Sequence, residues 1–146
     1  MELITLIKGK RHRICALIKG NHIPVISFLN EQSNISHRHA SYTRGLRTLM
    51  ERYANEGRQG LTTDQCHLAD KKEGIWEFRR GRLRIYFVMV DASGGQGQIV
   101  LLSHGIIKKH QKTKVRDKEE AKQLRNAYNL AMADGRLKIY QQGEKK

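Results

Sequence analysis

A chain of 146 residues is long enough to bury one hydrophobic core, so it predicts a single domain over residues 1–146. The formal net charge of +14 at pH 7 favours a negatively charged partner, and no apolar run approaches the roughly 20 residues of a membrane-spanning helix. Cys15 and Cys66 stand at no motif spacing, and residues 1–7 carry an acid where a secretory signal needs a cation. These features argue against a disulfide framework, a membrane span and a secretory signal, and they favour the cytoplasm.

The first expected element is a strand over residues 10–19, with an earlier start at 3–7 left open. Pro24 stands where a short helix begins, because proline is tolerated at the first helical position. A longer helix follows and ends at Gly57. Its apolar stripe recurs with the period of one buried helix face, at Tyr42, Leu46, Leu49, Met50 and Tyr53.

Residues 61–72 carry no pattern that assigns them to a helix or a strand. Residues 74–114, in contrast, are typical of three strands rich in Ile, Tyr, Phe and Val. Gly81 and the glycines of residues 94–97 supply the turns between these strands. The middle of the chain is therefore expected to form the sheet.

The last expected helix begins near Asp117, which resembles an N-cap with Glu120 as its capping-box partner, and it ends at Gly135. The tail, residues 136–146, is polar, and an edge strand within it is left open. The expected fold class is α+β: an antiparallel sheet of about four strands with two N-terminal helices and one C-terminal helix packed on one face. The core of this domain spans about residues 10–133.

Positive side chains are concentrated in the predicted strands. Residues 74–114 contain eight Lys or Arg against two acids. Strand alternation places Trp76 and Phe78 on the core face, and it places Arg79 and Arg84 on the other face. If neighbouring strands pair, these arginines and the basic residues after the last strand converge on one concave face of the sheet, opposite the helices.

A cation-lined face without paired carboxylates restricts the chemistry. The Gly94–Gly97 run is a hairpin turn rather than a nucleotide-binding loop ahead of a helix. His37 and His39, like Cys66 and His67, lack further ligands at metal spacing, so we expect no metal and no cofactor. The remaining reaction is cleavage of the RNA backbone, because attack of a 2′-OH on the adjacent phosphate builds negative charge that Arg or Lys stabilises. A crowded lysine is a reasonable base, because neighbouring cations disfavour its charge.

Four short segments carry a recognisable pattern: Gly74-Ile-Trp-Glu-Phe-Arg79, Arg84-Ile-Tyr-Phe, Leu101-Leu-Ser-His104-Gly and Lys108-Lys-His-Gln-Lys112-Thr. They resemble the RelE/ParE toxin superfamily, most closely its HigB-like, phage-derived branch. With the similar pattern from Pro24 to Gly57, the resemblance covers about residues 10–133. It implies a RelE-like microbial RNase toxin fold.

The same resemblance implies a function. The chain would be the toxin of a type II toxin–antitoxin system, a metal-independent, ribosome-dependent mRNA endonuclease (mRNA interferase) that inhibits translation. The implied partners are mRNA on the ribosome, with contacts to ribosomal RNA, and a small helix-turn-helix antitoxin protein.

The resemblance also assigns residues. Arg84 takes the position of a phosphate-stabilising arginine, and Arg79 matches the arginine that closes the preceding strand motif. The expected catalytic residues are Arg79, Arg84, Lys109 and Lys112. The expected RNA-binding residues are Arg82, Tyr86, His104, Lys108, His110 and Lys114.

Several points stay open in the sequence. Lys114 stands where the family usually has proline, and His110 replaces a more usual threonine. The general acid and base have no assigned residue. Tyr86 could stack on a base or line the sheet, and His104 could be a structural histidine. The alternative function is a non-catalytic protein of the same superfamily, either a phage-encoded regulator or a toxin that binds gyrase or another partner.

Overall fold

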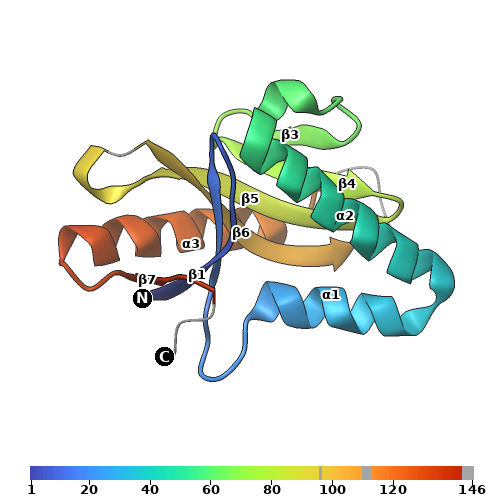
Figure 1. Ribbon diagram of the computed structural model, residues 1–146, viewed down its shortest axis with the longest axis horizontal. Coiled ribbons are helices and arrows are strands. Elements are labelled where there is room, and N and C mark those ends of the chain that lie inside the picture. Colours follow the sequence, from blue (N-terminus) through green and yellow to red (C-terminus); the bar gives the residue numbers. More distant parts are fainter. Residues whose placement is uncertain (96, 110–112, 143–146) are drawn as a thin grey trace.

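The computed structural model describes residues 1–95, 97–109 and 113–142, in which a seven-stranded sheet is packed against three α-helices (Figure 1). The strands are β1 (Glu2–Lys8), β2 (Arg13–Leu17), β3 (Cys66–Asp70), β4 (Ile75–Arg80), β5 (Leu83–Asp91), β6 (Gln98–Ile107) and β7 (Lys138–Tyr140). The helices are α1 (Pro24–Ile35), α2 (His37–Glu56) and α3 (Val115–Ala133), with short 3-10 turns at Arg58–Gly60 and Ser93–Gly95.

The strand order across the sheet is β3-β4-β5-β6-β2-β1-β7. The pairs β2–β6 and β1–β7 are parallel, and the other neighbouring strands are antiparallel. The α+β class with three helices is confirmed. The prediction of an antiparallel sheet of about four strands in a RelE-like fold is wrong, because the sheet is larger and mixed.

The additional strands come from three places in the chain. Residues expected to form one strand over 10–19 instead belong to the β1–β2 hairpin. The unassigned residues 61–72 contribute the edge strand β3, and the tail adds β7 beside β1. The helices α1 and α2 therefore follow a hairpin rather than the single strand that was expected.

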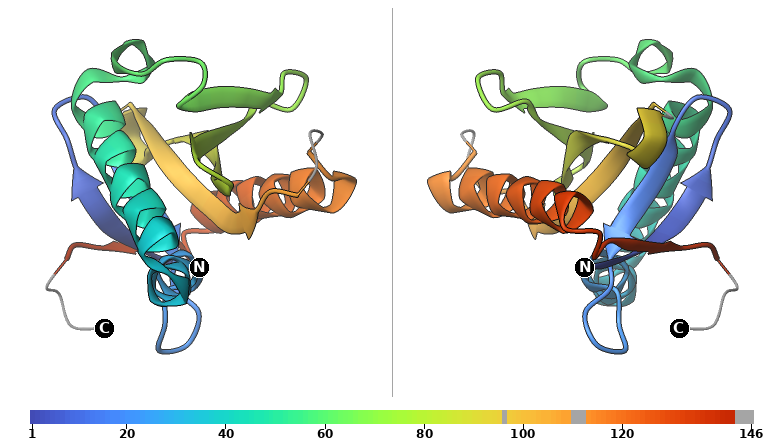
Figure 2. Two further views of the ribbon diagram at one scale, coloured as in Figure 1. Left: turned by 90° about the vertical axis from the view of Figure 1, so that its right-hand side faces the viewer. Right: turned by 90° about the vertical axis from the view of Figure 1, so that its left-hand side faces the viewer.

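The helices cover both faces of the sheet, whereas one covered face was expected. Figure 2 shows α2 and α3 on opposite sides of the strands. One buried cluster joins α1 and α2 to Phe78, Ile85 and Phe87. The other joins α3 to Tyr86 and Val88. The arginine-bearing face of β4 and β5 is therefore the face on which α3 packs.

The ends of the helices follow local signals in the sequence, with one exception. Pro24 occupies the first turn of α1, and the hydroxyl of Ser36 caps α2 by accepting a hydrogen bond from the His39 backbone N–H. Gly57, with φ of 76°, ends α2 in a backbone conformation that favours glycine. The exception is Asp117, which lies inside the first turn of α3 and does not cap it.

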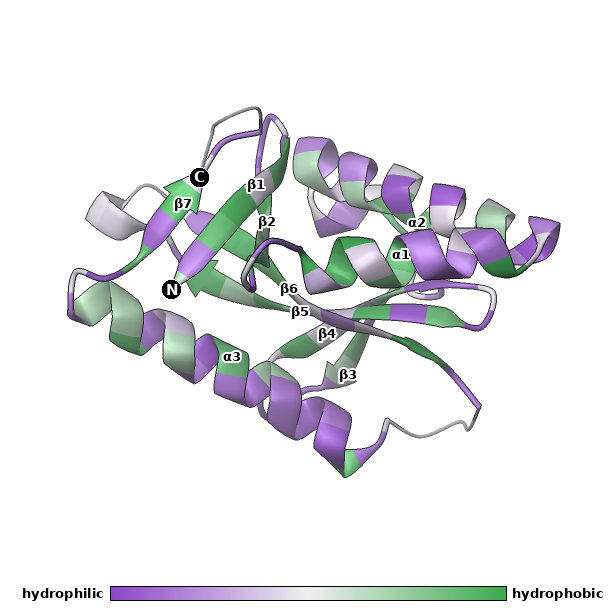
Figure 3. Cartoon of the chain, turned by 90° about the horizontal axis from the view of Figure 1, so that it is seen from below, coloured by the Kyte–Doolittle hydropathy of each residue, from purple (hydrophilic) through white to green (hydrophobic). Residues whose placement is uncertain are grey.

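The first half of α3 is strongly hydrophilic, in contrast to the apolar strands that it crosses (Figure 3). This half begins directly after Lys114, so charged side chains of the helix lie next to the end of β6. Within the described residues, no helix is both long enough and apolar enough to cross a membrane.

Candidate functional site

The pairing of β4 with β5 places two pairs of polar residues on the α3 side of the sheet. Arg79 lies opposite Arg84, and Glu77 lies opposite Tyr86. Paired residues point to the same face, so the register brings all four side chains together. The carboxylate of Glu77 lies 3.7 Å from Arg84 Nε and 3.9 Å from Arg79 Nε. Two arginines from adjacent strands therefore flank one acid.

The guanidinium of Arg84 is held rigidly by the backbone. Arg84 is only 8% exposed, and its Nη1 donates hydrogen bonds to the carbonyls of Gly81 (2.7 Å) and Leu83 (3.0 Å). Burial lowers the pKa of Arg84, and the neighbouring Arg79 lowers it further, whereas Glu77 opposes the shift. Since Arg84 Nε and Glu77 Oε1 make no hydrogen bond with another described residue, both atoms retain bonding capacity.

Lys108, directly after β6, is a third cation near Arg79 and Arg84, and these three residues form the cationic cluster. The backbone N–H of Lys108 donates to the carbonyl of Arg82 at 2.6 Å, which fixes the chain beside the β4–β5 turn. Burial is the main reason why the pKa of the Lys108 ammonium is lowered, and Arg84 and Arg79 lower it further. Glu77 acts in the opposite direction. Lys108 therefore lies within the electrostatic reach of both arginines, as the proposed convergence requires.

A small pocket of about 40 Å³ is lined by residues from the end of β6 and from the start of α3. Its lining includes the side chains of Lys108, Lys109, Lys114, Arg116 and Asp117. Lys109 and Lys114 are exposed, whereas Lys108 is half-buried. The expected contributions of His110 and Lys112 lie outside the described residues. The pocket shows that residues from both ends of this loop meet.

His104 connects β6 to α3. Asp117 Oδ1 accepts a hydrogen bond from His104 Nε2 at 3.0 Å, and the Ser103 hydroxyl lies 2.8 Å from Nδ1. The imidazole lies against the ring of Tyr86, with 5.1 Å between ring centroids. Asp117 is 3% exposed, and its other carboxylate oxygen has no hydrogen-bonding partner among the described residues. His104 thus positions the start of α3 beside the cationic cluster.

Two of the expected RNA-binding residues occupy very different environments. Tyr86 is fully buried and lines the sheet, one of the two roles that the sequence left open, and burial raises its pKa to about 12. Arg82 is exposed at the turn between β4 and β5. Of the expected RNA-binding residues, Arg82 and Lys114 are exposed, whereas Tyr86 is not.

Glu77 and Asp117 are the residues that sequence reasoning missed. Both are buried carboxylates, and each faces a cationic or imidazole partner. A signal for Glu77 was present, because it is the acid inside an otherwise apolar and basic strand. Asp117 had no comparable signal, since its position in a first helical turn predicts a cap.

No model of a known protein family matches the chain, and no curated protein sequence matches it either.

Proposed function

We propose that the chain is an endoribonuclease that cleaves mRNA in the cytoplasm and acts as the toxin of a toxin–antitoxin pair. The observation that carries this proposal is that Arg79 of β4 and Arg84 of β5 flank one buried carboxylate, with Lys108, directly after β6, within electrostatic reach of all three. The resemblance of the strand and lysine motifs to RelE/ParE toxins supports it. In this proposal the ribosome presents the mRNA, and a helix-turn-helix antitoxin holds the toxin inactive.

The cluster suits the charge that develops during RNA cleavage. The 2′-oxygen loses its proton and attacks the adjacent phosphorus, the bond from phosphorus to the 5′-oxygen breaks, and that oxygen takes a proton. The products are a 2′,3′-cyclic phosphate and a free 5′-hydroxyl. Arg84 and Arg79 stabilise the phosphoryl oxygens, on which negative charge accumulates in the transition state.

Lys108 is the best donor of the proton to the leaving oxygen. A general acid works most efficiently when its pKa lies near the working pH, and the pKa of Lys108 is lowered in that direction. Glu77 is a positioning residue, because its carboxylate lies beside both arginines and is almost fully buried. The base that accepts the 2′-OH proton is not assigned.

One observation favours a second candidate, a non-catalytic RNA- or partner-binding protein. Arg84 and Glu77 are buried, as in a structural ion pair, whereas the other cations nearby are at least partly exposed: Arg79, Arg82, Lys108, Lys109 and Lys114. Such a surface binds phosphates without cleaving them.

The two candidates differ in what happens to mRNA when the chain is expressed. Wild type should arrest growth and leave new mRNA ends at ribosome-bound positions. Lys108→Gln and Arg84→Lys should abolish both effects, and the exposed control Arg44→Gln should preserve them. Arrest with intact mRNA would establish the binding protein, and the absence of arrest in wild type would refute the toxin.

Lys108→Gln is included because Arg84 is also structural. Removing Arg84 altogether would leave the buried Glu77 with only Arg79, at 3.9 Å, as a partner, and breaking a buried ion pair costs up to about 3–5 kcal/mol. Loss of activity in an Arg84 variant alone could then reflect unfolding. The side chain of Lys108 makes no ion pair or hydrogen bond with another described residue, so its replacement tests chemistry rather than folding.

A further inference from the structure

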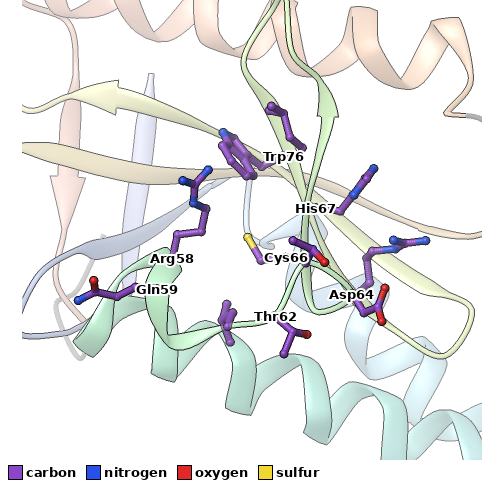
Figure 4. A pocket seen from close by; sticks show the side chains of 11 residues that line it. Arg58, Gln59, Thr62, Asp64, Cys66, His67 and Trp76 are labelled. Carbon is purple, nitrogen blue, oxygen red and sulfur yellow. The ribbon is translucent and has the colours of Figure 1, made fainter.

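A second cavity, larger than the lysine pocket, lies beside the edge strand β3. It measures about 700 Å³, and its walls come from the turn at Arg58–Gly60, from residues 61–64, and from β3 and β4. Figure 4 shows Arg58 extending from this turn toward Trp76 on β4. The volume is within the range of small-molecule sites, about 300–1,000 Å³.

The aromatic wall of this cavity is a stack of flat groups. Trp76 lies nearly parallel to Phe87, with an interplanar angle of 16° and 6.4 Å between ring centroids. The guanidinium of Arg58 lies over the indole, 4.7 Å from its centroid. Arg58 and Trp76 both line the cavity. Flat aromatic and guanidinium groups of this kind are the surfaces on which unpaired bases stack in RNA-binding proteins.

Polar side chains stand around the same cavity with bonding capacity unused. Gln59, Asp64 and His67 line it, and their side chains make no hydrogen bond or ion pair with another described residue. The amide of Gln59 and the carboxylate of Asp64 offer donors and acceptors to the edge of a base, whereas His67 pairs with Glu77 and projects from the other face of β3. Gln59 and Asp64 lie on a short turn and beside the sheet edge, where a strand of RNA has access.

Arg79 lies at the rim of this cavity, and its side chain projects from the face of β4 opposite Trp76, which is the face of the cationic cluster. Arg79 Nε lies 3.9 Å from the carboxylate of Glu77. The cavity wall includes Arg58 and Arg79 against Asp64, so the site favours an anion over a cation. A nucleotide provides both the flat base and the negative phosphate that this wall complements.

We propose that the cavity holds one base of a single-stranded RNA, stacked on the Arg58–Trp76 pair, while a more distant phosphate of the same strand, beyond the edge of the sheet, lies on the cluster of Arg79, Arg84 and Lys108. This inference rests on the proposed action on RNA. It adds a site that reads the identity of one nucleotide at a distance from the bound phosphate. Asp64 and Gln59 are the residues that would discriminate among bases, since they offer an acceptor and an amide to the base edge.

Trp76 is the only tryptophan of the chain, so its fluorescence reports on this cavity alone. The purified chain is titrated at low salt with eight-nucleotide oligo(A), oligo(C) and oligo(U), and with heparin as a polyanion without bases. The RNAs should change Trp76 emission in parallel with binding measured by anisotropy. Heparin should bind with little change in emission. Different affinities for the three RNAs would identify the preferred base.

Arg58→Lys retains the charge and removes the flat group, so RNA affinity should fall about tenfold, as expected for one base stack. Arg44→Lys on α2 is the matched control and should bind as wild type. RNA binding that leaves Trp76 emission unchanged, or equal emission changes with heparin, would overturn the base site while leaving the proposed function intact. No RNA binding at all, together with no mRNA cleavage in cells, would overturn both.

Discussion

At the scale of single residues, the electrostatic environment of Lys108 makes a prediction about stability. The pKa of Lys108 is lowered from 10.5 in the folded chain, mainly by burial. Between the lowered pKa and 10.5 the unfolded chain binds more protons than the folded one, so this residue makes stability rise with pH in that window. Below the window, burial of the charge lowers the free energy of unfolding by a constant amount. Solvent screening makes this amount smaller, because the side chain is partly exposed.

Lys108→Met should therefore be more stable than wild type at pH 7, and the difference should shrink as the pH approaches 10.5. Urea unfolding at several pH values measures the two free energies of unfolding. Lys109→Met, at an exposed position, is the control and should show little difference from wild type at any pH. A Lys108→Met difference that is absent at pH 7, or that grows with pH, would contradict the burial of the charge.

The cysteines make a second prediction at this scale. Burial raises the pKa of the Cys66 thiol to about 12, and it also raises the pKa of Cys15. Both thiols are buried and unpaired. Because the thiolate is the reactive form, a thiol-specific dye at pH 8 should label neither residue in the folded chain and both in urea. Rapid labelling of the native chain would show that one of these sites opens.

The side of the sheet on which each residue lies could be predicted, but its degree of burial could not. Alternation placed Phe78 on one face and Arg79 and Arg84 on the other, and the β4–β5 register confirms this assignment. The period of two is a local property of the backbone. Whether a face is open depends on which distant element covers it, and α3 covers the face of Arg84 and Tyr86. The expected open concavity was therefore partly wrong.

At the scale of elements, the N-terminal hairpin shows why a strand was misplaced. The expected strand over 10–19 began within a segment rich in cations, residues 8–13. In the structure residues 9–12 form the turn between β1 and β2. The backbone N–H groups of Arg11 and His12 both donate to the carbonyl of Ala54, each at 2.9 Å. The turn is stabilised by contact with the end of α2, which a local pattern does not contain.

Gly9 is the residue that permits this contact. A Cβ atom at position 9 would overlap the backbone carbonyl of Ala54 and could not be relieved by rotating a side chain. Gly9→Ala should therefore lower the free energy of unfolding by about 1–3 kcal/mol, the usual effect of overpacking. Thermal or urea unfolding measures the change. Lys10→Ala, at the exposed neighbouring position, should have a much smaller effect, and equal effects of the two variants would contradict the close approach.

At the scale of the whole molecule, the parallel strand pairs were beyond prediction. They join β2 to β6 and β1 to β7, segments that are far apart in the chain. Hairpin signals such as Gly81 predict only pairings between neighbours in sequence, and β4–β5 is the pairing that this glycine indicated correctly. The same limit applies to the candidate site, since Asp117 of α3 reaches His104 only through the tertiary fold.

The distribution of charge over the molecule allows a test of the central claim, that the cations near the end of β6 form a specific phosphate site. The net charge of +14 is spread widely, and exposed arginines also occur on α2, away from the cluster. General attraction would make all exposed cations roughly equivalent in RNA binding. A built phosphate site would make the cations after β6 much more important than the others.

The most direct test is the salt dependence of RNA binding by two variants that lose the same charge. One replaces Lys108, Lys109 and Lys114 by Gln, and the other replaces Arg38, Arg44 and Arg52 on the exposed face of α2 by Gln. If the lysines contact phosphates, the slope of log affinity against log salt should fall by about 0.7 for each lost contact in the first variant, and much less in the second. Equal slopes for the two variants, or wild-type binding that does not respond to salt, would contradict the site.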